Sequence, residues 1–389
     1  MDFLNRILLE WELATQIPPD IFTLLLWVLA ALVLVRLIMY WSTFARIIFY
    51  KITTPRLIDP KPPVSVVIAA RDEYLNLYEN LPAVLEQDYP DFEVIVVNND
   101  STDDSAVLLR NFQQQYPHLK VITLEKNLNF FKGKKFPLSL GIRAAKNDIL
   151  IFTDADCKPA SPQWLNHMQS GFTNDTGIVL GVGQYNTGPG LLNRLIRFET
   201  FTIAIQYLGL ALAGIPYMGV GRNLAYRKSL FLREKGFISH YKIPSGDDDL
   251  FVNRAAPNTT VNIRIHPDAH TYSRPASTLK RYLIQKRRHL STAKHYKPLH
   301  KILLATYSTT ALLLYLFLAI NLALQQFVLL SCFLFVINWL NQLFILKKTA
   351  HKLRIKILYV LSPLFEVMLL MLYLVVWTAN LFSKPAKWK

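Results

Sequence analysis

"DILIFTDADC", residues 148–157, joins a short apolar run to two aspartates, Asp154 and Asp156. The apolar run is typical of a buried strand, and a strand is a rigid support for the side chains that come directly after it. Two carboxylates held in this way can ligate a hard divalent cation, Mg²⁺ or Mn²⁺, that also binds phosphate oxygens. Position 155 between them is an alanine, Ala155, whose side chain offers no ligand to a cation. Aspartate is also favoured in turns and in helix caps, so a purely structural role is the alternative.

Three similar runs precede this one, and each is followed by a segment typical of a helix. The predicted strands are residues 64–70 in "PPVSVVIAARDE", residues 92–97 in "FEVIVVNNDSTDDS", and "LKVITLEKN" at 119–127. The predicted helices end near "EQDYP" at 86–90, run through residues 106–115, and lie around residues 137–145. This alternation predicts an α/β fold with a mostly parallel sheet and helices on both faces.

Ligands of such sheets bind at the carboxyl ends of the strands. Asn98 and Asn99 follow the second predicted strand, and Asp154 and Asp156 follow the fourth. We therefore expect these four side chains at the edge of the sheet where a ligand binds.

Four long apolar runs flank this region, at residues 21–40, 302–324, 327–346 and 357–381. Each is close to the roughly 20 residues that cross a bilayer as a helix. They predict three parts: residues 1–56 with one anchor, a soluble domain at 57–301, and about three transmembrane helices at 302–389. Buried helices of a soluble protein are the alternative, although such uncharged runs in succession are unusual there. Pro363 and Glu366 leave open whether the last run crosses fully.

Basic residues adjoin the predicted membrane helices. They are Arg46, Lys51 and Arg56 after the first helix, residues 280–297 before the second, and residues 347–356 after the third. By the positive-inside tendency these segments face the cytoplasm, which predicts an integral protein of the plasma (inner) membrane with its soluble domain in the cytoplasm. The basic tail of Lys384, Lys387 and Lys389 is discordant. Either the stronger clusters outweigh this tail, or the last run does not cross.

The chain has 389 residues, 52% of them hydrophobic, and a formal net charge of +16. Such a charge fits anionic lipid headgroups, a polyanionic small molecule or nucleic acid. Much of the excess lies beside membrane segments, which favours lipid headgroups. The basic residues lack interleaved aromatic residues on a soluble face, which argues against nucleic acid. Cys157 and Cys332 fall in the soluble domain and in a membrane helix, so we expect no disulfide framework.

A basic turn follows the third predicted strand, in "NFFKGKKFPLSLGI" at 129–142. Gly133 lets the backbone turn freely, and Lys134 and Lys135 offer ammonium groups to a phosphate or a base. A solvated loop is the alternative for this turn.

Asp247, Asp248 and Asp249 stand together in "PSGDDDLFVNR" at 244–254, at the start of a predicted helix. Like charges this close repel one another, so the cluster requires a helix N-terminus, a cation or a shared proton. One carboxylate whose pKa is raised by its neighbours can act as a general base toward an attacking hydroxyl. A helix cap with acids that suit the helix dipole is the alternative.

Gln285, Arg287, Arg288 and His289 lie in the basic segment "YLIQKRRHLSTAKHY" at 282–296. A phosphate clamp would use an arginine fork at this place. A solvated positive-inside segment explains most of the charge, but it does not require Gln285 or His289.

Residues 191–221 are apolar enough to suggest a further crossing. That crossing would put the Asp154 loop and the three consecutive aspartates on opposite sides of the membrane. We therefore expect an amphipathic segment lying at the membrane interface, with Arg194, Arg197 and Glu199 near one end. A buried core helix is an equal alternative.

The ordered set of strand, Asp-x-Asp, acidic cluster and Gln-x-x-Arg resembles the family 2 glycosyltransferases, which are inverting enzymes with a GT-A fold that use nucleotide sugars. The resemblance covers residues 64 to about 297, and the flanking helices resemble those of members that glycosylate lipids or build polysaccharide. It implies that "VIAARDE" at 67–73, with Ala70, Arg71 and Glu73, and the loop with Asn98 and Asn99 bind the nucleotide base and ribose.

The resemblance also implies roles for the later motifs. Lys134 contacts the nucleotide, Asp154 and Asp156 bind the metal and the diphosphate, and the acidic motif supplies the base. "GVGRNLAYRKSLF" at 219–231 lines the acceptor side, with Arg222 and Asn223 exposed to substrate. Arg288 and the metal on Asp156 stabilise the departing nucleotide diphosphate in a direct displacement.

The chain departs from the family pattern at three places. Asn98 and Asn99 replace the usual Asp-Asp, although an Asn carbonyl can still accept the uracil imide hydrogen. Three aspartates replace Glu-Asp, so the base is Asp248 first and Asp249 second, with the register open to Asp247. His289 stands where a tryptophan would stack beneath the acceptor sugar, which counts against processive polymer synthesis.

The expected function is therefore a membrane-bound, metal-dependent, inverting glycosyltransferase. It would move a sugar from a nucleotide sugar, a UDP-sugar in the first instance, to a hydroxyl of a lipid or lipid-linked acceptor. A processive polysaccharide synthase and a catalytically inactive membrane binding protein on the same scaffold are the alternatives. The sugar, the acceptor, the metal and the oligomeric state are left open.

Overall fold

The computed structural model describes residues 2–16, 20–53, 60–125 and 133–383, and these fall into two compact units. The helical unit comprises Met1–Phe49 and Pro298–Leu374, and the α/β unit comprises Tyr50–Lys297 and Val375–Lys389. The expected boundary at 56/57, Arg56 and the basic tail of Lys384, Lys387 and Lys389 lie outside the described residues. Each unit is described by itself.

The α/β unit is built on a seven-stranded sheet in the order β3-β2-β1-β4-β8-β6-β9. Its strands are β1 (Val64–Ala70), β2 (Phe92–Asn99), β3 (Leu119–Leu124), β4 (Ile149–Phe152), β6 (Thr176–Leu180), β8 (Leu224–Arg227) and β9 (Thr260–Ile263). The strands β1 to β4 pair in parallel, as predicted, whereas β8 runs antiparallel to both of its neighbours. The α/β class with a mostly parallel sheet is therefore confirmed. Strand β1 has the predicted bounds, and β2 extends two residues further, to Asn99.

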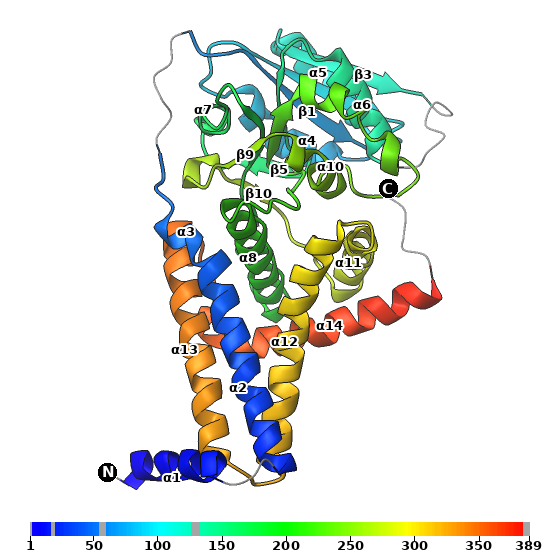
Figure 1. Ribbon diagram of the computed structural model, residues 1–389. Helices are drawn as coiled ribbons and strands as arrows, with labels where there is room; N and C mark the ends of the chain where they lie inside the picture. Colours follow the sequence, from blue (N-terminus) through cyan, green and yellow to red (C-terminus); the bar gives the residue numbers. More distant parts are fainter. Residues whose placement is uncertain (1, 17–19, 54–59, 126–132, 384–389) are drawn as a thin grey trace. The chain divides into compact units, whose positions relative to one another are not determined.

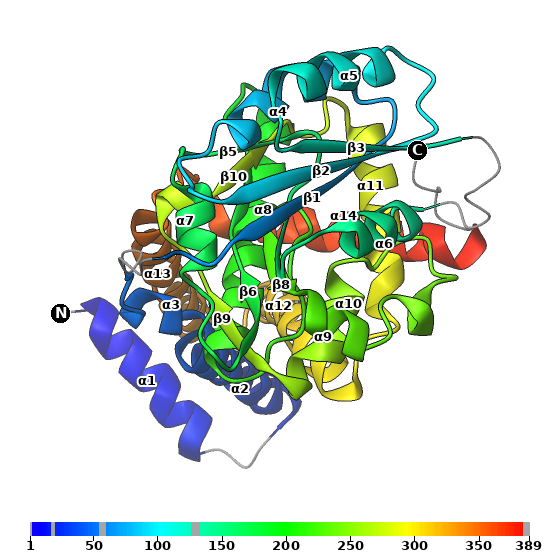
Figure 2. The same cartoon turned by 90° about the horizontal axis from the view of Figure 1, so that it is seen from above.

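Helices cover both faces of this sheet (Figure 2), as predicted. They include α4 (Tyr74–Leu85), α5 (Ser105–Gln115), α6 (Lys135–Ala144) and α7 (Trp164–Gln169). Alternate residues of β1 point to opposite faces: Val66 packs in one core with Leu81 of α4, whereas Val67 faces Gly141 of α6. A Cβ on Gly141 would come within 2.6 Å of the Val67 side chain, so glycine allows α6 to approach the sheet closely.

A smaller three-stranded sheet completes the α/β unit. It contains β5 (Cys157–Pro159), β10 (Thr271–Ser273) and β7 (Gly183–Tyr185), in that order. The later helices of the unit are α8 (Leu191–Leu212), α9 (Lys228–Arg233), α10 (Asp249–Ala255) and α11 (Leu279–Ala293), with short 3-10 turns at η2 (Ile238–His240), η3 (Ala256–Asn258) and η4 (Pro267–Ala269). None of these strands and turns was predicted from the sequence, because each is only three residues long.

Helix α8 is largely buried within the α/β unit. Glu199, expected near a membrane interface, is 1% exposed, accepts a hydrogen bond from Tyr282 and forms an ion pair with Lys286, both of α11. The Tyr207 hydroxyl donates to the Gly181 backbone carbonyl at 2.7 Å. The buried core helix, which was weighed equally with an interfacial segment, therefore describes the packing of α8, and contact with a membrane interface stays a prediction.

The helical unit contains α1 (Asp2–Gln16), α2 (Ile21–Met39), the π-helical turn η1 (Tyr40–Phe44), α3 (Arg46–Phe49), α12 (Pro298–Ala323), α13 (Val328–Lys352), the 3-10 turn η5 (Tyr359–Leu361) and most of α14 (Ser362–Phe382). Helices α2, α12 and α13 run side by side (Figure 1). Among the described residues, five helices are long and apolar enough to span a membrane. Four of them coincide with the predicted runs, and the fifth is α8. Helix α1 was not predicted.

A polar network lies inside the helical unit. Arg36 of α2 is 1% exposed and donates two hydrogen bonds to the Glu366 carboxylate of α14, at 2.8 and 3.0 Å. Its Nε donates to Asn338 of α13 at 3.1 Å, and the Tyr315 hydroxyl of α12 donates to Glu366 at 2.8 Å. The network therefore links four helices. Each charged side chain in it has a partner, and without that partner its burial among apolar helices would be costly.

We expect Glu366→Leu to destabilise the helical unit, because Arg36 would remain buried without its carboxylate. Breaking a buried ion pair from one side costs about 3–5 kcal/mol, whereas replacing both partners with apolar residues is often close to neutral. Thermal unfolding of the detergent-solubilised chain should therefore show a lower midpoint for Glu366→Leu and recovery in the double variant Arg36→Met/Glu366→Leu. Equal losses in both variants would contradict this role for the pair.

Candidate active site

The predicted metal ligands Asp154 and Asp156 follow β4 directly, on a short turn that leads into β5. Both remain partly exposed, and Asp154 accepts a hydrogen bond from the Lys134 ammonium group. Burial acts to raise the pKa of Asp154, but Lys134, Arg222 and Arg288 outweigh it and lower that pKa. Burial and the neighbouring Asp154 charge raise the pKa of Asp156 to about 6. A divalent cation between the two would favour the ionised form of both carboxylates.

The residue between these two aspartates, at position 155, has a different task. Position 155 holds an alanine and not an aspartate, so it offers no side-chain ligand to a cation or a nucleotide. Ala155 is 7% exposed and packs in one core with Leu77 of α4 and Trp164 of α7. Its backbone carbonyl accepts from the Asn80 side-chain amide at 3.4 Å. Residue 155 is therefore not a binding residue; its methyl group anchors the turn in the core while its two neighbours face outward.

The donor set at this turn fits a hard cation. Asp154, Asp156 and Cys157 each offer one ligand atom, and these atoms lie within 4.8 Å of one another. Burial and the adjacent carboxylates raise the pKa of the Cys157 thiol, so it stays protonated, and its sulfur donates to Asp156 at 3.3 Å. Two carboxylates without a thiolate are oxygen ligands of the kind that Mg²⁺ and Mn²⁺ prefer.

Lys134, at the N-terminus of α6, joins this turn to the cluster of three aspartates. Its ammonium group contacts Asp154 and lies 3.8 Å from the Asp247 carboxylate. Burial acts to lower the pKa of Lys134, but Asp154 and Asp247 raise it above its usual value, so the side chain stays charged. The structure therefore brings together two acidic groups that are far apart in the sequence.

Lys135 does not have the role that the sequence suggested. It is 4% exposed, and its ammonium group donates to the backbone carbonyls of His240, Ile243 and Ser245 at 2.7–2.8 Å. Burial lowers its pKa to about 8, although nearby aspartates act in the opposite direction. The expectation that Lys135 offers its charge to a phosphate is therefore wrong: the side chain fixes the loop that leads into the aspartate cluster.

Asp248 is the N-cap residue of α10 and is held by two backbone amides. Its carboxylate accepts from the Gly221 N–H at 2.7 Å and from the Asp249 N–H at 2.8 Å. Burial, followed by the charges of Asp247 and Asp249, raises the pKa of Asp248 to about 7. A Cβ on Gly221 would lie 3.3 Å from the carboxylate oxygen, so glycine allows this close approach. A partly exposed carboxylate with a pKa near neutrality suits a general base.

Asp249 is engaged differently. It is buried, and its carboxylate accepts hydrogen bonds from the Thr292 and Tyr296 hydroxyls at 2.5 and 2.6 Å and from the Leu250 N–H at 2.7 Å. These bonds tie α10 to the end of α11 and its following turn. Sequence reasoning missed Thr292 and Tyr296; their only signal was that two hydroxyl residues occur four apart, directly after the Gln-x-x-Arg segment.

The predicted nucleotide loops follow β1 and β2, where Ala70 pairs with Asn98. Arg71 lies 3.7 Å from Asp100, and the Asp72 carboxylate accepts from the Thr102 N–H at 2.7 Å. These contacts connect the two loops; Asp72 and Asp100 lie in the predicted nucleotide motifs but were not singled out as site residues.

Other predicted residues of these loops have partners inside the chain. The buried Asn98 side-chain carbonyl accepts from the Ser101 hydroxyl at 2.5 Å, which competes with the expected bond to a uracil ring. Asn99 is buried at the end of β2. The charge of Glu73, just before α4, contributes to the raised pKa of Asp156, after burial and Asp154. Glu73 therefore lies near the Asp-x-Asp turn.

Arg222 supplies a second cation near the Asp-x-Asp turn. Its guanidinium group lies over the Tyr185 ring, 4.5 Å from the centroid, and Gln285 donates to the Tyr185 hydroxyl at 3.2 Å. Burial acts to lower the pKa of Arg222, but Tyr185 and Cys157 raise it, so the side chain stays charged. Tyr185 was missed in the sequence; it connects β7, Arg222 and the Gln-x-x-Arg helix.

Asn223 was expected to be exposed to substrate, and that expectation is wrong. It is fully buried, donates to the carbonyls of Val182 and Ala269, and accepts from the Trp164 indole N–H at 3.1 Å. All of its side-chain polar groups are therefore used inside the α/β unit. Asn223 supports the site through β8 and does not face a ligand.

The remaining residues of the predicted clamp lie on α11 and diverge. Arg288 lies close enough to Asp154 to help lower its pKa, after Lys134 and Arg222. Arg287 instead donates to Asn380, to the Ala379 carbonyl and to Ser383, at the end of α14. His289 is exposed. Of the predicted arginine fork, only Arg288 is brought to the Asp-x-Asp turn.

Comparison with known proteins identifies a segment that carries part of this site: Lys134, Asp154, Asp156 and Arg222 lie within it, whereas Asp248 and Arg288 follow it. The family model described as glycosyl transferase family 2 matches residues 65–233. A probable glycosyltransferase of Bacillus subtilis, YdaM, is 29% identical over 239 residues, which are 58% of this chain and 54% of that protein. The chain thus spans about half the length of this relative.

Two shorter matches have more specific names. A poly-beta-1,6-N-acetyl-D-glucosamine synthase of Staphylococcus epidermidis is 30% identical over 24% of this chain and 21% of its own length. A beta-monoglucosyldiacylglycerol synthase of Synechocystis is 31% identical over 25% of this chain and 20% of its own length. The proteins that match over these shorter regions therefore include one named for polysaccharide synthesis and one named for glycolipid synthesis.

A solved structure shares the fold. The mannosyltransferase PcManGT of Pyrobaculum calidifontis, in complex with GDP-Man and Mn²⁺, aligns with a TM-score of 0.57 at 19% identity. The alignment covers 86% of this chain and 99% of that protein. The predicted GT-A fold is therefore confirmed.

We expect Lys134→Met to destabilise the chain in the absence of divalent cations, because Asp154 and Asp247 would lose their shared counter-charge. Hydrogen bonds to charged groups contribute on the order of 1–3 kcal/mol, so the unfolding midpoint in EDTA should fall by several degrees. Mn²⁺ should restore part of the loss, since a metal on Asp154 and Asp156 replaces the missing positive charge. The exposed lysine variant Lys120→Met is the control, and identical midpoints for the two variants in EDTA would contradict this role.

Proposed function

Because this chain is a family 2 glycosyltransferase, we propose that it is an inverting, metal-dependent enzyme that transfers a sugar from a nucleotide sugar to a hydroxyl of a lipid or lipid-linked acceptor. The observation that carries the proposal is the position of Lys134 between Asp154 and Asp247. One cation is within reach of both the metal-binding candidates and the cluster with the candidate base. A displacement at an anomeric carbon requires these two functions on either side of one bond.

Asp248 is the residue we propose as the base. Its carboxylate would remove the proton from the acceptor hydroxyl as that oxygen attacks the anomeric carbon of the donor sugar, while the bond to the nucleotide diphosphate breaks. Its pKa of about 7 suits this exchange at neutral pH. Asp249 is less suited, because its oxygens already accept from Thr292, Tyr296 and the Leu250 N–H.

The diphosphate would leave on the opposite side, among positive charges. Asp154 and Asp156 would hold Mg²⁺ or Mn²⁺, which supplies a Lewis acid for the departing phosphate oxygens. Lys134, Arg222 and Arg288 lie around the same turn and would add fixed positive charge, which stabilises the leaving group without reorganisation. The loops after β1 and β2 would bind the nucleoside, with Ala70, Arg71, Glu73, Asn98 and Asn99. A UDP-sugar is the first donor to test.

The helices long enough to cross a membrane favour a lipid acceptor. Four predicted apolar runs are helices long enough to cross a bilayer, and the basic segments beside them favour a cytoplasmic α/β unit at the plasma membrane by the positive-inside tendency. A relative named for the synthesis of a glucosylated diacylglycerol fits the same acceptor class.

A processive polysaccharide synthase is the second candidate, and the relative named for poly-N-acetylglucosamine synthesis favours it. His289, in the position where the resemblance expects an acceptor-stacking tryptophan, counts against it. Product length separates the two candidates: a single sugar added to extracted lipid supports the lipid glycosyltransferase, and a ladder of products supports the polymerase.

We expect membranes that contain the chain to transfer label from one nucleotide sugar of a UDP- and GDP-sugar panel to extracted lipid. Asp248→Asn should lower the rate by about 10²–10⁴-fold, because the general base is lost. Asp156→Ala should abolish the dependence of transfer on divalent cations. Asp248→Asn should still bind the donor. A donor-binding measurement therefore separates a loss of catalysis from a loss of folding.

If both variants transferred sugar as fast as the unaltered chain, the roles proposed for these residues would be wrong. Nucleotide binding without release of nucleotide diphosphate, in the presence of metal and lipid, would instead favour the inactive binding protein.

The transfer rate should also depend on pH through Asp248. Since the pKa of this carboxyl is raised to about 7, the ionised base is the main form above pH 7 and is lost as the pH falls. We expect kcat/KM to fall about tenfold for each pH unit below the apparent pKa and to level off above it. Initial rates between pH 5.5 and 8.5 would check this, and a flat profile would exclude Asp248 as the base.

A further inference from the structure

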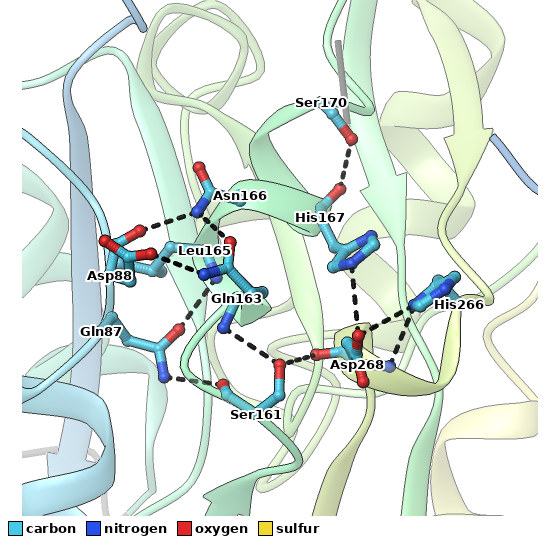
Figure 3. A network of polar contacts seen from close by, with 10 residues as sticks. All are labelled: Gln87, Asp88, Ser161, Gln163, Leu165, Asn166, His167, Ser170, His266 and Asp268. Carbon is cyan, nitrogen blue, oxygen red and sulfur yellow. Dashed lines mark hydrogen bonds and ion pairs between the residues drawn. The ribbon is translucent and has the colours of Figure 1, made fainter. Parts of the chain in front are cut away.

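A second cluster of ligand-type side chains lies apart from the Asp-x-Asp turn in the α/β unit. His167 on α7 meets His266 and Asp268 at the short turn η4 (Figure 3). The Asp268 carboxylate lies 3.9 Å from His167 Nε2 and 3.6 Å from His266 Nδ1. One ligand atom from each residue lies within 4.8 Å of the other two. The mechanism proposed above uses none of these residues.

The two imidazoles of the cluster differ in their surroundings. His167 is 4% exposed, and burial, followed by the charge of His266, lowers its pKa to about 4, so it is neutral at pH 7. His266 Nδ1 accepts a hydrogen bond from the Asp268 N–H at 3.2 Å, so an ion that binds at this nitrogen would replace that hydrogen bond. Neutral imidazole is the form that ligates metals. Asp268 is 48% exposed on its side chain, so the cluster is reachable from solvent.

The cluster also has a feature that the protein alone leaves unsatisfied. His167 Nδ1 is buried and has no hydrogen-bond partner within the described part of the chain. The two rings stack with their centroids 4.2 Å apart and their planes 8° from parallel. Stacking of the two rings does not supply a partner for this buried nitrogen.

Hydrogen bonds hold the segments that carry His167, His266 and Asp268 (Figure 3). Gln163 and Asn166 at the start of α7 donate to the Asp88 side chain and backbone at 2.6 and 2.7 Å, and Gln87 accepts from the Leu165 N–H at 3.1 Å. The Ser161 hydroxyl donates to the Asp268 carbonyl at 3.3 Å. These bonds fix the backbone of α7 and η4, so a metal would need movement of side chains only.

We propose that His167, His266 and Asp268 form a binding site for Zn²⁺, separate from the hard-cation site at Asp154 and Asp156. Two imidazoles and one carboxylate are a typical ligand set for zinc, with remaining positions for water. Ligand nitrogens must come to about 2.0–2.1 Å from the ion, and their lone pairs lie in the ring planes. The partly exposed ring of His266 therefore rotates out of its parallel stack with His167 when the ion binds.

The bound ion would connect α7 with η4, and both contact the segment of Arg222 and Asn223 directly before β8. Asn223 accepts from Trp164 of α7 and donates to the Ala269 carbonyl of η4. The neighbouring Arg222 carbonyl accepts from Thr271, which follows η4 in β10. Zinc at this place stabilises the frame under Arg222 and takes no part in the sugar transfer itself, so its presence is measurable without the activity.

The test is zinc binding to the full chain in detergent, stripped of metal and kept in excess Mg²⁺ to occupy hard-cation sites. We expect about one Zn²⁺ per chain by elemental analysis after gel filtration, and a rise in the unfolding midpoint with added Zn²⁺. His266→Asn retains a side chain that can cap η4, and Asp268→Asn retains the shape of the carboxylate. Each should weaken zinc binding at least about tenfold and remove the stabilisation by zinc.

His118→Asn is the matched control, because it removes a partly buried imidazole whose Nε2 lies 3.0 Å from the Leu85 carbonyl, away from the cluster. It should bind zinc as the unaltered chain does. Zinc binding that is unchanged in His266→Asn and Asp268→Asn would overturn the proposal, and so would an unaltered chain that binds no zinc. A loss of transfer activity in any of these variants has no bearing on the result, since the measurement is of the metal and of stability.

Discussion

The ammonium group of Lys134 is the interaction on which the arrangement of the candidate site depends. It contacts Asp154 after β4 and lies near Asp247 before α10, in a place where several carboxylates would otherwise repel one another. Effective dielectric is low inside a protein, so both repulsion and compensation are larger there than in water. The position of α6 is therefore coupled to the positions of both acidic groups. The close approach of α6 to the sheet, which Gly141 allows, puts Lys134 within reach.

The other cations near the Asp-x-Asp turn come from segments that lie later in the sequence. Arg222 precedes the antiparallel strand β8, and Asn223 fixes that strand by bonds to Val182, Ala269 and Trp164. Helix α11 is held to α8 by Glu199, and its end is held to α10 by Asp249. The carboxylates of this unit thus fall into two groups: Asp154, Asp156 and Asp248 stay partly exposed at the candidate site, whereas Glu199 and Asp249 are buried and connect helices.

Much of the fold could be predicted because it follows from local patterns. The first four strands are continuous apolar runs separated by helices, which is the pattern of a parallel sheet buried on both faces. The three-residue strands β5, β7 and β10 left no such pattern, since a strand this short contains too few residues to show a period. The same limit applies to Glu199 and Asn223: both looked accessible in the sequence, and both satisfy partners that lie far away along the chain.

By itself, the sequence determined the class of sheet, the apolar helices, and which acidic and basic motifs belong to one glycosyltransferase pattern. These features depend on residues that are close in the chain, where periodicity and spacing are visible. Only the tertiary structure decided that Asp249 is the buried one of the three aspartates, that Lys134 and not Lys135 faces the acids, and that Arg288 and not Arg287 approaches Asp154. The reason is physical: the ionisation and availability of a side chain depend on its burial and on charges nearby in space, and neither can be read from its neighbours in sequence.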